Sequence, residues 1–463
     1  MKKILLTLAC AFALSTAASA QTPYFVTQGI GAAITPQNHI VSDVEAVDAS
    51  TAWILFRENI ANGTARRFVR TVDGGTTWTG GPLNIPANLS VTNFTAVDGN
   101  TAWIAAYSTA GAGGGVFKTT DGGVTWTRQP TAAFTGADAF PNVIHFFDAN
   151  NGVVMGDPNP RPAGGVGGSL EVYTTTDGGT NWTRVSRAPV TTDAFEYGLV
   201  NSYFALGNTI WAGGYNDDDR AVRLYKSTNM GVTWTAAPTD LLAAVNHIAF
   251  ADQNNGLMAN GLDLVKTTDG GATNTAIGYT GEFRDAGMDA VPGLPNTYVV
   301  VGSRDFAADS LNDYGASISR DGGVTWDVLD SSKGMFEIDV VSPSVGWAGS
   351  FLGATAVNGA VYKLNRSVTL ANKPMAAVKA DIQVYPNPSA NGVFTLRNGA
   401  VNNKIGRVVV SDALGRQVYS TNLQDARVAG QEAPIDLSKQ KAGVYTMLLQ
   451  TEKGSVVEKL VIQ

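Results

Sequence analysis

Short apolar segments alternate with polar turns along most of the chain, and one arrangement of them recurs. An apolar stretch is followed by a polar turn and then by a second apolar stretch, which is the pattern of two paired strands. Seven segments have this form: VEAVDASTAWILF (44–56), FTAVDGNTAWIAAY (94–107), VIHFFDANNGVVMG (143–156), YFALGNTIWAGG (203–214), HIAFADQNNGLMA (247–259), VPGLPNTYVVVG (291–302) and IDVVSPSVGWAGSF (338–351). The pattern predicts seven antiparallel strand pairs.

A second motif, which we call the box, follows six of these pairs. The six boxes are TVDGGTTW (71–78), TTDGGVTW (119–126), TTDGGTNW (175–182), STNMGVTW (227–234), TTDGGATN (267–274) and SRDGGVTW (319–326), and their third positions are Asp73, Asp121, Asp177, Asn229, Asp269 and Asp321. An Asp or Asn at such a position accepts hydrogen bonds from the amides of its own turn, and the next glycine permits positive φ. Because six similar turns spread around a fold cannot converge on one site, we expect these residues to stabilise turns.

The spacing of the boxes predicts the architecture. Successive third positions lie 48, 56, 52, 40 and 52 residues apart, which is about the length of one four-stranded propeller blade. We therefore predict an all-β protein with a seven-bladed β-propeller over residues 21–366. The seventh unit has no box and no outer strand of its own, and Tyr24–Thr27 is predicted to supply that strand and cover an open edge.

The boxes resemble the Asp-box (BNR) repeat of sialidase, sortilin and photosystem II assembly-factor propellers. The wider pattern GDPN…TTDGGTNW…EYG…GNTIWAGG…LYKSTNMGVTW (156–234) is similar to assembly-factor-type propellers that occur as secreted proteins in the Bacteroidetes. These resemblances imply a fold and no defined chemistry.

The N-terminal 20 residues, MKKILLTLACAFALSTAASA, have the form of a secretory signal peptide. Two lysines precede an apolar run too short for a membrane span, and Ala18-Ser19-Ala20 is a small-residue cleavage site. A lipoprotein signal around Cys10 is the alternative. Cleavage after Ala20 removes the only cysteine of the chain, so we expect neither a disulfide nor a thiolate metal ligand. No other segment has the length and hydropathy of a transmembrane helix.

The last part of the chain has a different character. Residues 367–380 are predicted to be a linker, and residues 381–463 contain seven strand candidates with glycine-containing turns, which indicates a small Ig-like β-sandwich. The blocks VYPNPSANGVFTL (384–396), VVVSDALGRQVY (408–419), IDLSKQKAGVYTMLL (435–449) and KLVIQ (459–463) closely resemble the type A C-terminal sorting domain of the type IX secretion system. The resemblance implies a Bacteroidetes source, recognition by the type IX machinery, export through the periplasm to the cell surface or medium, and removal of this domain.

Charge separates the two parts of the chain. The formal net charge is −7, but residues 21–374 carry 20 basic and 32 acidic residues, a net −12, whereas residues 375–463 carry ten and seven, a net +3. An acidic propeller argues against nucleic-acid binding. The three histidines of the chain leave little material for a His/Cys metal site, and His145 and His247 occupy similar inner-strand positions that favour packing or channel lining.

Ligand-binding candidates lie on the face of the propeller opposite the boxes, where function usually resides. The long loops between the second and third strands of the blades, together with the crossings between blades, supply the candidates Asp157, Arg161, Glu196, Tyr197, Asp217, Asp218, Asp219, Arg220, Arg284, Arg304 and Asp305. We expect no cofactor, although the oxygens of Asp217–Asp219 are of the type that Ca²⁺ prefers.

Three classes of function remain open, of which an assembly-factor or chaperone-like role is the third. The first is a secreted or cell-surface protein that binds a protein or glycan without chemistry. The second is a glycoside hydrolase, sialidase- or xyloglucanase-like, acting from the same face through paired acids such as Asp157 and Asp305. The nearest match to the sialidase arginine motif, Phe56-Arg57-Glu58-Asn59, lacks the Ile-Pro of that motif, so binding is the leading hypothesis and no catalytic residue is assigned.

Overall fold

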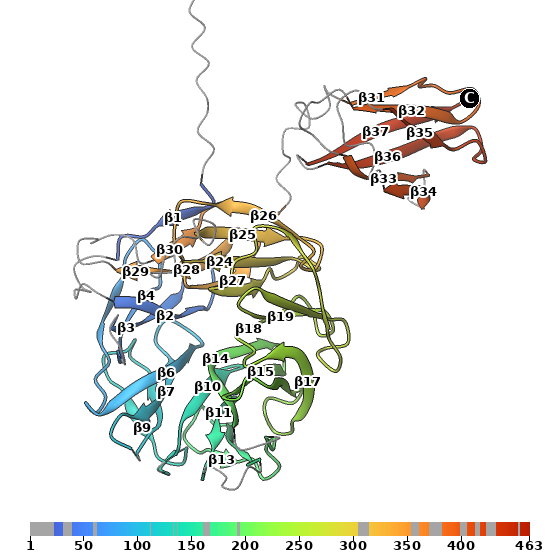
Figure 1. Ribbon diagram of the computed structural model, residues 1–463. Coiled ribbons are helices and arrows are strands. Elements are labelled where there is room, and N and C mark those ends of the chain that lie inside the picture. Colours follow the sequence, from blue (N-terminus) through green and yellow to red (C-terminus); the bar gives the residue numbers. More distant parts are fainter. Residues whose placement is uncertain are drawn as a thin grey trace, which may run out of the picture. The chain divides into compact units, whose positions relative to one another are not determined.

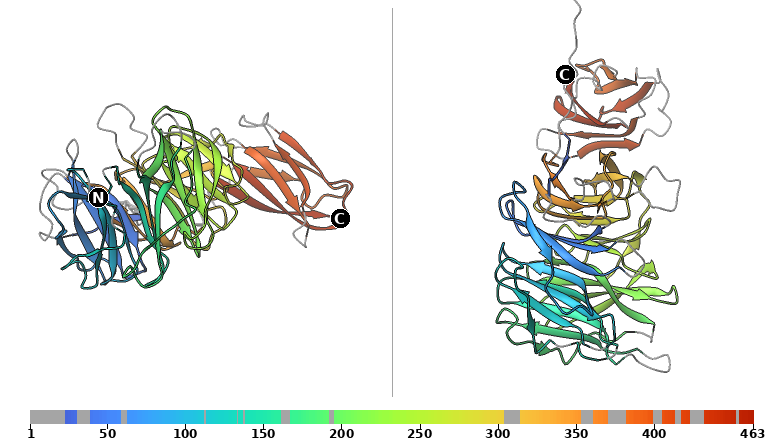
Figure 2. Two further views of the ribbon diagram at one scale, coloured as in Figure 1. Left: turned by 90° about the horizontal axis from the view of Figure 1, so that it is seen from below. Right: turned by 90° about the vertical axis from the view of Figure 1, so that its left-hand side faces the viewer.

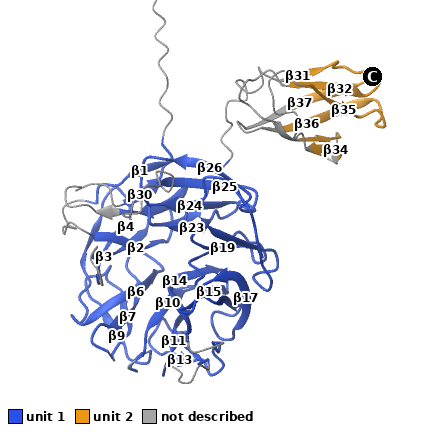
Figure 3. Cartoon of the chain, in the orientation of Figure 1, with its two compact units in different colours: residues 1–369 blue, residues 370–463 orange. Residues whose placement is uncertain are grey.

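The computed structural model forms two compact units, residues 1–369 and 370–463 (Figure 3). The structure describes residues 23–30, 39–58, 63–111, 113–132, 134–136, 138–160, 167–191, 195–303, 314–352, 361–369, 382–398, 405–412, 417–422, 432–451 and 454–463. The predicted signal peptide and residues 370–380 of the predicted linker lie outside these residues. Residues 367–369, which were also predicted to be linker, belong to unit 1, where Val368 is buried in the core. In both units, every described element is a strand (Figure 2).

Unit 1 is a β-propeller whose seven sheets follow one another around a ring in chain order (Figure 1). Blade 1 contains β2 (His39–Ala46), β3 (Ala52–Glu58), β4 (Ala65–Thr71) and β5 (Thr79–Pro82), with β29 (Phe351–Leu352) beside β2. Blade 2 contains β6 (Leu89–Ala96), β7 (Ala102–Ser108), β8 (Gly115–Thr119) and β9 (Thr127–Gln129). Blade 3 contains β10 (Pro141–Phe146), β11 (Gly152–Pro158), β12 (Leu170–Thr175) and β13 (Thr183–Arg184).

The remaining blades have the same order from the centre outward. Blade 4 contains β14 (Glu196–Leu206), β15 (Thr209–Asn216), β16 (Ala221–Ser227) and β17 (Thr235–Leu242). Blade 5 contains β18 (His247–Phe250), β19 (Gly256–Asn260), β20 (Asp263–Thr267) and β21 (Thr275–Ala276). Blade 6 contains β23 (Gly287–Ala290), β24 (Tyr298–Gly302), β25 (Gly315–Ser319) and β26 (Thr325–Asp330), with β22 (Thr280–Gly281) added in parallel to β26.

The seventh blade joins the two ends of the propeller sequence. Its inner strands are β27 (Glu337–Ser342), β28 (Val345–Gly349) and β30 (Val361–Leu364), and its outer strand is β1 (Phe25–Thr27). Phe25 lies opposite Leu364 in the antiparallel ladder and its ring is buried. The prediction that the N-terminal strand closes the seventh blade is confirmed.

The boxes connect the third and fourth strands of blades 1–6, and their polar groups bond within the turn. In blade 1, Asp73 Oδ1 accepts the Thr77 amide at 2.8 Å and Asp73 Oδ2 accepts the Thr77 hydroxyl at 2.6 Å. These bonds hold the pKa of the exposed Asp73 carboxyl below its usual value. Gly75 has φ +88°, and a Cβ there would lie 2.9 Å from the Trp347 ring. Both the backbone conformation and the lack of space therefore require glycine at this position.

Adjacent blades are linked by contacts of a lysine side chain and a tryptophan indole with the box of a neighbouring blade. Lys118 of blade 2 lies 4.9 Å from the Trp103 ring centroid and donates to the carbonyl of Gly178 in the box of blade 3. The Trp103 indole N–H donates to the same carbonyl at 3.1 Å. Lys363 of blade 7 likewise lies over the Trp347 ring and donates to the Gly74 carbonyl of blade 1, although the Trp347 indole N–H makes no hydrogen bond to a described residue. This contact links the last blade to the first on the box side, as β1 does at the outer edge. The tryptophans therefore bind blade to blade.

Unit 2 is a β-sandwich. One sheet contains β31 (Ile382–Tyr385), β32 (Val393–Asn398) and β35 (Glu432–Asp436), and the other contains β33 (Ile405–Ser411), β34 (Gln417–Asn422), β36 (Gly443–Thr451) and β37 (Gly454–Ile462). Its core contains Phe394, Val408, Ile435, Met447 and Leu460. All seven strand candidates of the sequence analysis are present.

Candidate functional site

The two faces of the propeller are distinguished by their connections. Each box bonds to the turn between the first and second strands of its own blade, for example through the Gly122 amide and the Asn100 carbonyl at 3.0 Å. Boxes and these turns therefore share one face, the box face. The loops between second and third strands and the crossings between blades form the other, which we call the loop face.

The loop face contains a pocket between blades 2 and 3, with a volume of about 260 Å³. Its walls include Tyr107 at the end of the second strand of blade 2, Phe140 in the crossing, and the acidic residues Asp138 and Asp157. The Tyr107 and Phe140 rings are tilted against each other, with centroids 4.6 Å apart. One of the sequence candidates, Asp157, therefore lies in a pocket that combines two acids with two aromatic rings.

Neighbouring strands hold Asp157 in place. Asp157 lies on β11, and its Oδ1 accepts the side-chain amide of Asn142 on β10 at 2.6 Å. The backbone amide of Gly198, on β14 of the next blade, donates to the same oxygen at 3.2 Å. A carboxylate held by two donors on two blades is pre-oriented, which lowers the entropy cost of binding.

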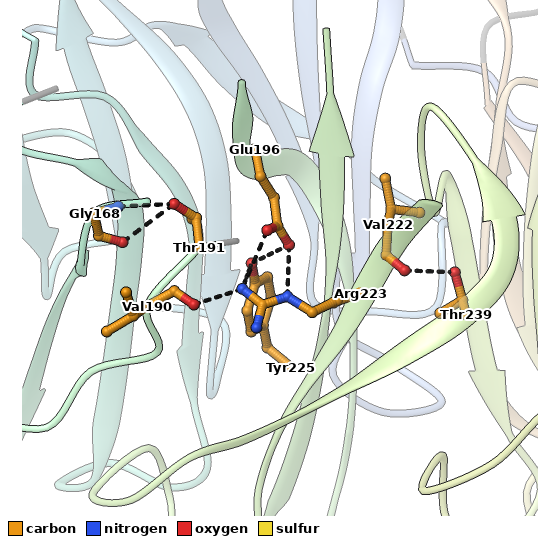
Figure 4. A network of polar contacts seen from close by, with 8 residues as sticks. All are labelled: Gly168, Val190, Thr191, Glu196, Val222, Arg223, Tyr225 and Thr239. Atoms are coloured by element: carbon orange, nitrogen blue, oxygen red, sulfur yellow. Dashed lines mark hydrogen bonds and ion pairs between the residues drawn. The ribbon is translucent and has the colours of Figure 1, made fainter. Parts of the chain in front are cut away.

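Blade 4 contains a buried ion pair below the loop face (Figure 4). Arg223 on β16 donates from Nε to Glu196 Oε1 at 2.9 Å and from Nη2 to Glu196 Oε2 at 3.1 Å. The Tyr225 hydroxyl donates to Glu196 Oε1 at 2.6 Å, and burial together with this carboxylate raises the Tyr225 pKa. Glu196 therefore compensates the charge of Arg223 within the blade.

Three predicted loop residues are buried, and this corrects their expected position. Glu196 is 1% exposed, Tyr197 6% and Arg284 3%. Glu196 and Tyr197 begin β14 rather than extending the crossing, and Arg284 Nε donates to Ser317 Oγ at 3.1 Å. The crossings descend into the blades earlier than the sequence indicated, so these side chains pack inside the propeller instead of facing solvent.

The acidic loop of blade 4, residues 217–220, is exposed as expected. Arg220 forms an ion pair with Asp218 at 2.8 Å, and its guanidinium lies 5.9 Å from the Phe195 ring centroid. Among the described residues, no group of three or more His, Cys, Asp or Glu has the arrangement of a metal site. The candidates Arg161, Arg304 and Asp305 lie outside the described residues.

Exposed apolar side chains border this loop on the same face. Val190 and Phe195 belong to the crossing between blades 3 and 4, Leu242 ends β17, and Leu262 lies in the hairpin of blade 5, with exposures of 54%, 40%, 59% and 57%. The Leu242 carbonyl accepts the side chain of Asn260, two residues before Leu262. We call these four residues the apolar rim.

The centre of the ring contains a polar network that sequence reasoning missed. Asp43 on β2 accepts the Phe94 amide of the next blade at 3.3 Å and the Asn93 side chain at 2.7 Å. Asn93 in turn accepts the Ile144 amide at 2.7 Å. Asp289 accepts a hydrogen bond from the Val340 amide, and Asp339 accepts one from the Ala46 amide, each at 2.6 Å. The same pattern therefore recurs between blades 6 and 7 and between blades 7 and 1. The sequence feature that could have indicated this network is the presence of polar residues within otherwise apolar inner strands.

Asn201 reaches across the centre from blade 4. A bulge in β14 gives it φ +56°, and it bonds to Asn93 at 2.8 Å and Asp43 at 3.3 Å, on blades 2 and 1. Burial raises the pKa of Asp43 to about 7 and that of Asp339 to about 6. His145, on an inner strand as expected, contacts the Tyr203 ring, and burial lowers its pKa to about 4.

Comparison with known proteins decides the nature of the C-terminal unit. Residues 383–463 match the family described as "Secretion system C-terminal sorting domain". The C-terminal unit is a secretion-system sorting domain. The sorting domain indicates that the protein is secreted to the cell surface or beyond it, and that the type IX secretion machinery is its partner. No described helix has the length and hydropathy of a membrane span.

Solved structures similar to the chain include propellers. YCF48 bound to a D1 peptide is 17% identical, with a TM-score of 0.49, over 75% of this chain and 99% of its own. PorZ, a bacterial surface component of the type IX secretion system of Porphyromonas gingivalis, is 15% identical, with a TM-score of 0.43, over 91% of this chain and 59% of its own. A search of curated proteins found no match. The protein is an all-β chain in which a propeller precedes the sorting domain.

Proposed function

We propose that this protein is a secreted propeller that binds a protein ligand through its loop face and is carried out of the cell by its sorting domain. The apolar rim is the observation that supports the proposal most. The rim consists of four exposed apolar side chains, and Arg220 lies over the ring of one of them, Phe195. This composition is typical of a protein interface. A glycan ligand and a glycoside hydrolase are the competing outcomes.

A photo-crosslinking experiment tests the binding face. A benzophenone amino acid is placed at Phe195 or Leu242, and at Val124 as the control, because Val124 is 67% exposed on the box face. Intact producing cells are irradiated, and adducts are identified by mass spectrometry. We expect one dominant adduct from the two rim positions and none from Val124.

The identified partner is then purified and titrated against variants of the mature chain. Leu242→Asp is expected to weaken binding about tenfold or more, as for a residue at an interface centre, whereas Val124→Asp leaves it unchanged. Equal adducts from both faces, or no effect of Leu242→Asp, would contradict a loop-face protein interface.

A glycan array and a fluorogenic glycosidase panel test the competing outcomes. Most glycosidases use a pair of carboxylates, and two acidic residues, Asp138 and Asp157, line the pocket between blades 2 and 3. Turnover that Asp157→Asn abolishes would replace the binding proposal with a hydrolase.

The route of export is tested by removing residues 381–463. We propose that the signal peptide is cleaved after Ala20 and that the sorting domain directs type IX export and is then removed. The truncated protein is expected to accumulate in the periplasm, whereas full-length Leu242→Asp is exported like the natural chain. Normal export of the truncated protein would overturn this assignment.

A further inference from the structure

We infer that the partner segment bound at the apolar rim combines apolar side chains with lysine or arginine side chains. The inference rests on the proposed function and deepens it, because it states which chemical class of protein segment the rim recognises. It draws on the backbone bonds that hold the rim, on the exposed carboxylates around it, and on the side chains that cover the edge of β17.

Backbone hydrogen bonds join the apolar rim and the acidic loop into one frame. The Asp217 amide donates to the Phe195 carbonyl at 3.1 Å, and the Ala243 amide donates to the Arg220 carbonyl at 2.9 Å. Ala243, with φ +63°, is the central residue of a γ-turn that begins at Leu242. The exposed rim side chains and the loop carboxylates are therefore held in a fixed arrangement, which lowers the entropy cost of binding.

Exposed carboxylates outnumber exposed cations around the rim. In the acidic loop and within three positions of a rim residue, the described charged side chains that are exposed are Asp217, Asp218, Asp219, Asp240, Asp263, Arg187 and Arg220. Arg220 is paired with Asp218 at 2.8 Å, and the neutral Tyr215 hydroxyl donates to Asp217. The excess of acids gives this surface a negative charge, which favours a partner segment of opposite charge.

The acids stand directly beside the apolar side chains. Asp240 and Leu242 are both exposed and lie two positions apart on β17, so they share one face of that strand. Leu262 and Asp263 are neighbours in the hairpin of blade 5. A lysine or arginine suits such a surface, because its methylene stem packs on apolar groups while its charged end reaches a carboxylate.

Side chains of blade 5 cover the outer edge of β17, which opposes binding by strand addition. Asn274, which replaces the tryptophan of the box in blade 5, accepts the Asp240 amide and donates to the Pro238 carbonyl, both at 2.9 Å. Asn260 donates to the Leu242 carbonyl at 2.7 Å. A partner that added a strand here would have to displace these bonds. Recognition is therefore expected to depend on side chains.

The carboxylates also argue against a lipid surface as the occupant of the rim. Exposed apolar side chains can insert into a membrane, but anionic lipid headgroups attract basic segments. They repel a surface with an excess of acids. A protein segment with lysine or arginine complements both the apolar and the acidic groups, and a membrane is the competing outcome of the experiment.

Fluorescence anisotropy of labelled peptides with the mature full chain tests the inference. The probes are acetyl-GLKKLFKKLG-amide, its counterparts with glutamine or glutamate at every lysine, and a counterpart with serine at every leucine and phenylalanine. We expect the lysine peptide to bind about fivefold more tightly, or better, than the glutamine and serine peptides, and the glutamate peptide not to bind. The preference for lysine should disappear when sodium chloride rises from about 50 to 500 mM. Flotation with vesicles of phosphatidylethanolamine and phosphatidylglycerol tests membrane binding.

Variants locate the binding and separate charge from apolar contact. Asp217→Asn combined with Asp219→Asn is expected to weaken the lysine peptide about fivefold and leave the glutamine peptide unchanged. Asparagine tolerates the φ of +53° at position 219. Leu242→Ser is expected to weaken both peptides. Asp327→Asn, at an exposed acid on the outer strand of blade 6, leaves both unchanged, and thermal melting of every variant provides the folding control.

Several outcomes would overturn the inference. Absence of lysine-peptide binding, equal affinity of the lysine and glutamate peptides, or no effect of the paired asparagine variant would show that the rim does not select basic segments. Unchanged peptide binding in Leu242→Ser would place the peptide elsewhere. Flotation of the chain with vesicles, lost in Leu242→Ser, would assign the rim to a membrane.

Photo-crosslinking at the apolar rim reports separately on the proposed function. Rim adducts together with equal affinities of the lysine and glutamate peptides would reject this inference and leave the proposed function standing. Lysine-specific peptide binding at the rim without adducts from producing cells would reject the proposed interface and leave the chemical preference of the rim standing.

Discussion

The box face and the loop face of the propeller are built from the same seven blades, yet they differ in how much one blade resembles the next. On the box face, four other turns repeat the bonds of Asp73 with the same spacing, and Asn229 reproduces most of them in blade 4. On the described part of the loop face, a pocket lies between blades 2 and 3, and the acidic loop 217–220 belongs to blade 4. Repetition therefore marks the face that holds the ring together, and variation marks the face available to a ligand.

The prediction with the largest expected effect concerns the strand that closes the ring. Deletion of residues 21–35 takes away β1 with the buried Phe25, removes the buried Ile30 that follows this strand, and exposes the edge of β30. We expect the free energy of unfolding to fall by more than about 5 kcal/mol, because loss of a single buried aromatic side chain costs about 3–5 kcal/mol. Calorimetry of the mature chain measures the effect, and an unchanged melting temperature would reject closure by β1.

A second test breaks one clasp on the box face. Trp103→Ala removes a fully buried indole that stacks on Phe146 at 3.5 Å and donates to Gly178 of the next blade. We expect destabilisation of about 3–5 kcal/mol and unchanged loop-face binding below the lowered melting temperature. Denaturant unfolding with a ligand titration measures both, and a binding loss in the folded variant would contradict the separation of the two faces.

A third test concerns the centre of the ring, between the two faces. Because burial raises the pKa of Asp43 from 3.8 to about 7, the folded state binds this proton more tightly than the unfolded state. Stability is then greatest below about pH 4 for this group and falls as the pH rises toward 7. Asp43→Asn is expected to remove a decline on the order of 2–4 kcal/mol.

Unfolding titrations from pH 4 to 8 compare the natural chain with this variant. The slope against pH is the decisive quantity, because the amide changes hydrogen bonds to Asn93 and Asn201 as well as charge. Parallel slopes would show that Asp43 titrates as an ordinary carboxyl.

The smallest expected effect is on the stability of rim variants. Leu242→Asp and Val124→Asp change exposed side chains on opposite faces, so we expect both to alter the free energy of unfolding by less than about 0.5 kcal/mol. Only Leu242→Asp is expected to weaken binding of the protein partner. A large stability loss in Leu242→Asp would show that the rim is part of the fold rather than a contact surface.

The sequence predicted the repeated parts well because their local chemistry suffices. An Asp with two glycines and a Thr-Trp pair specifies the same turn wherever it occurs, so the seven blades, the strand supplied by residues 24–27 and the seven C-terminal strands could all be inferred. Assigning residues 24–27 to the seventh blade needed only the observation that this blade lacked a strand, whereas the register that pairs Phe25 with Leu364 is seen only in the structure.

The positions that sequence reasoning missed depend on contacts between distant residues. Glu196 looked like a loop acid because nothing near it in the chain indicates Arg223, its partner 27 positions away. Asn201 is similar, because its role requires a bulge in β14 and two partners on other blades. The pocket combines an exposed acid, two rings and Asp157 from three segments, and no single segment carries a recognisable motif.

Closure by β1 also has a consequence in time. Phe25 is among the first propeller residues to leave the ribosome and Leu364 among the last, and at about 5–20 residues per second roughly 20–70 s separate their synthesis. Throughout that interval the earliest strand has no partner, and Phe25 has no core to enter. Any factor that holds this short segment apart from other chains would therefore govern the yield of the intact ring, however stable the finished ring is.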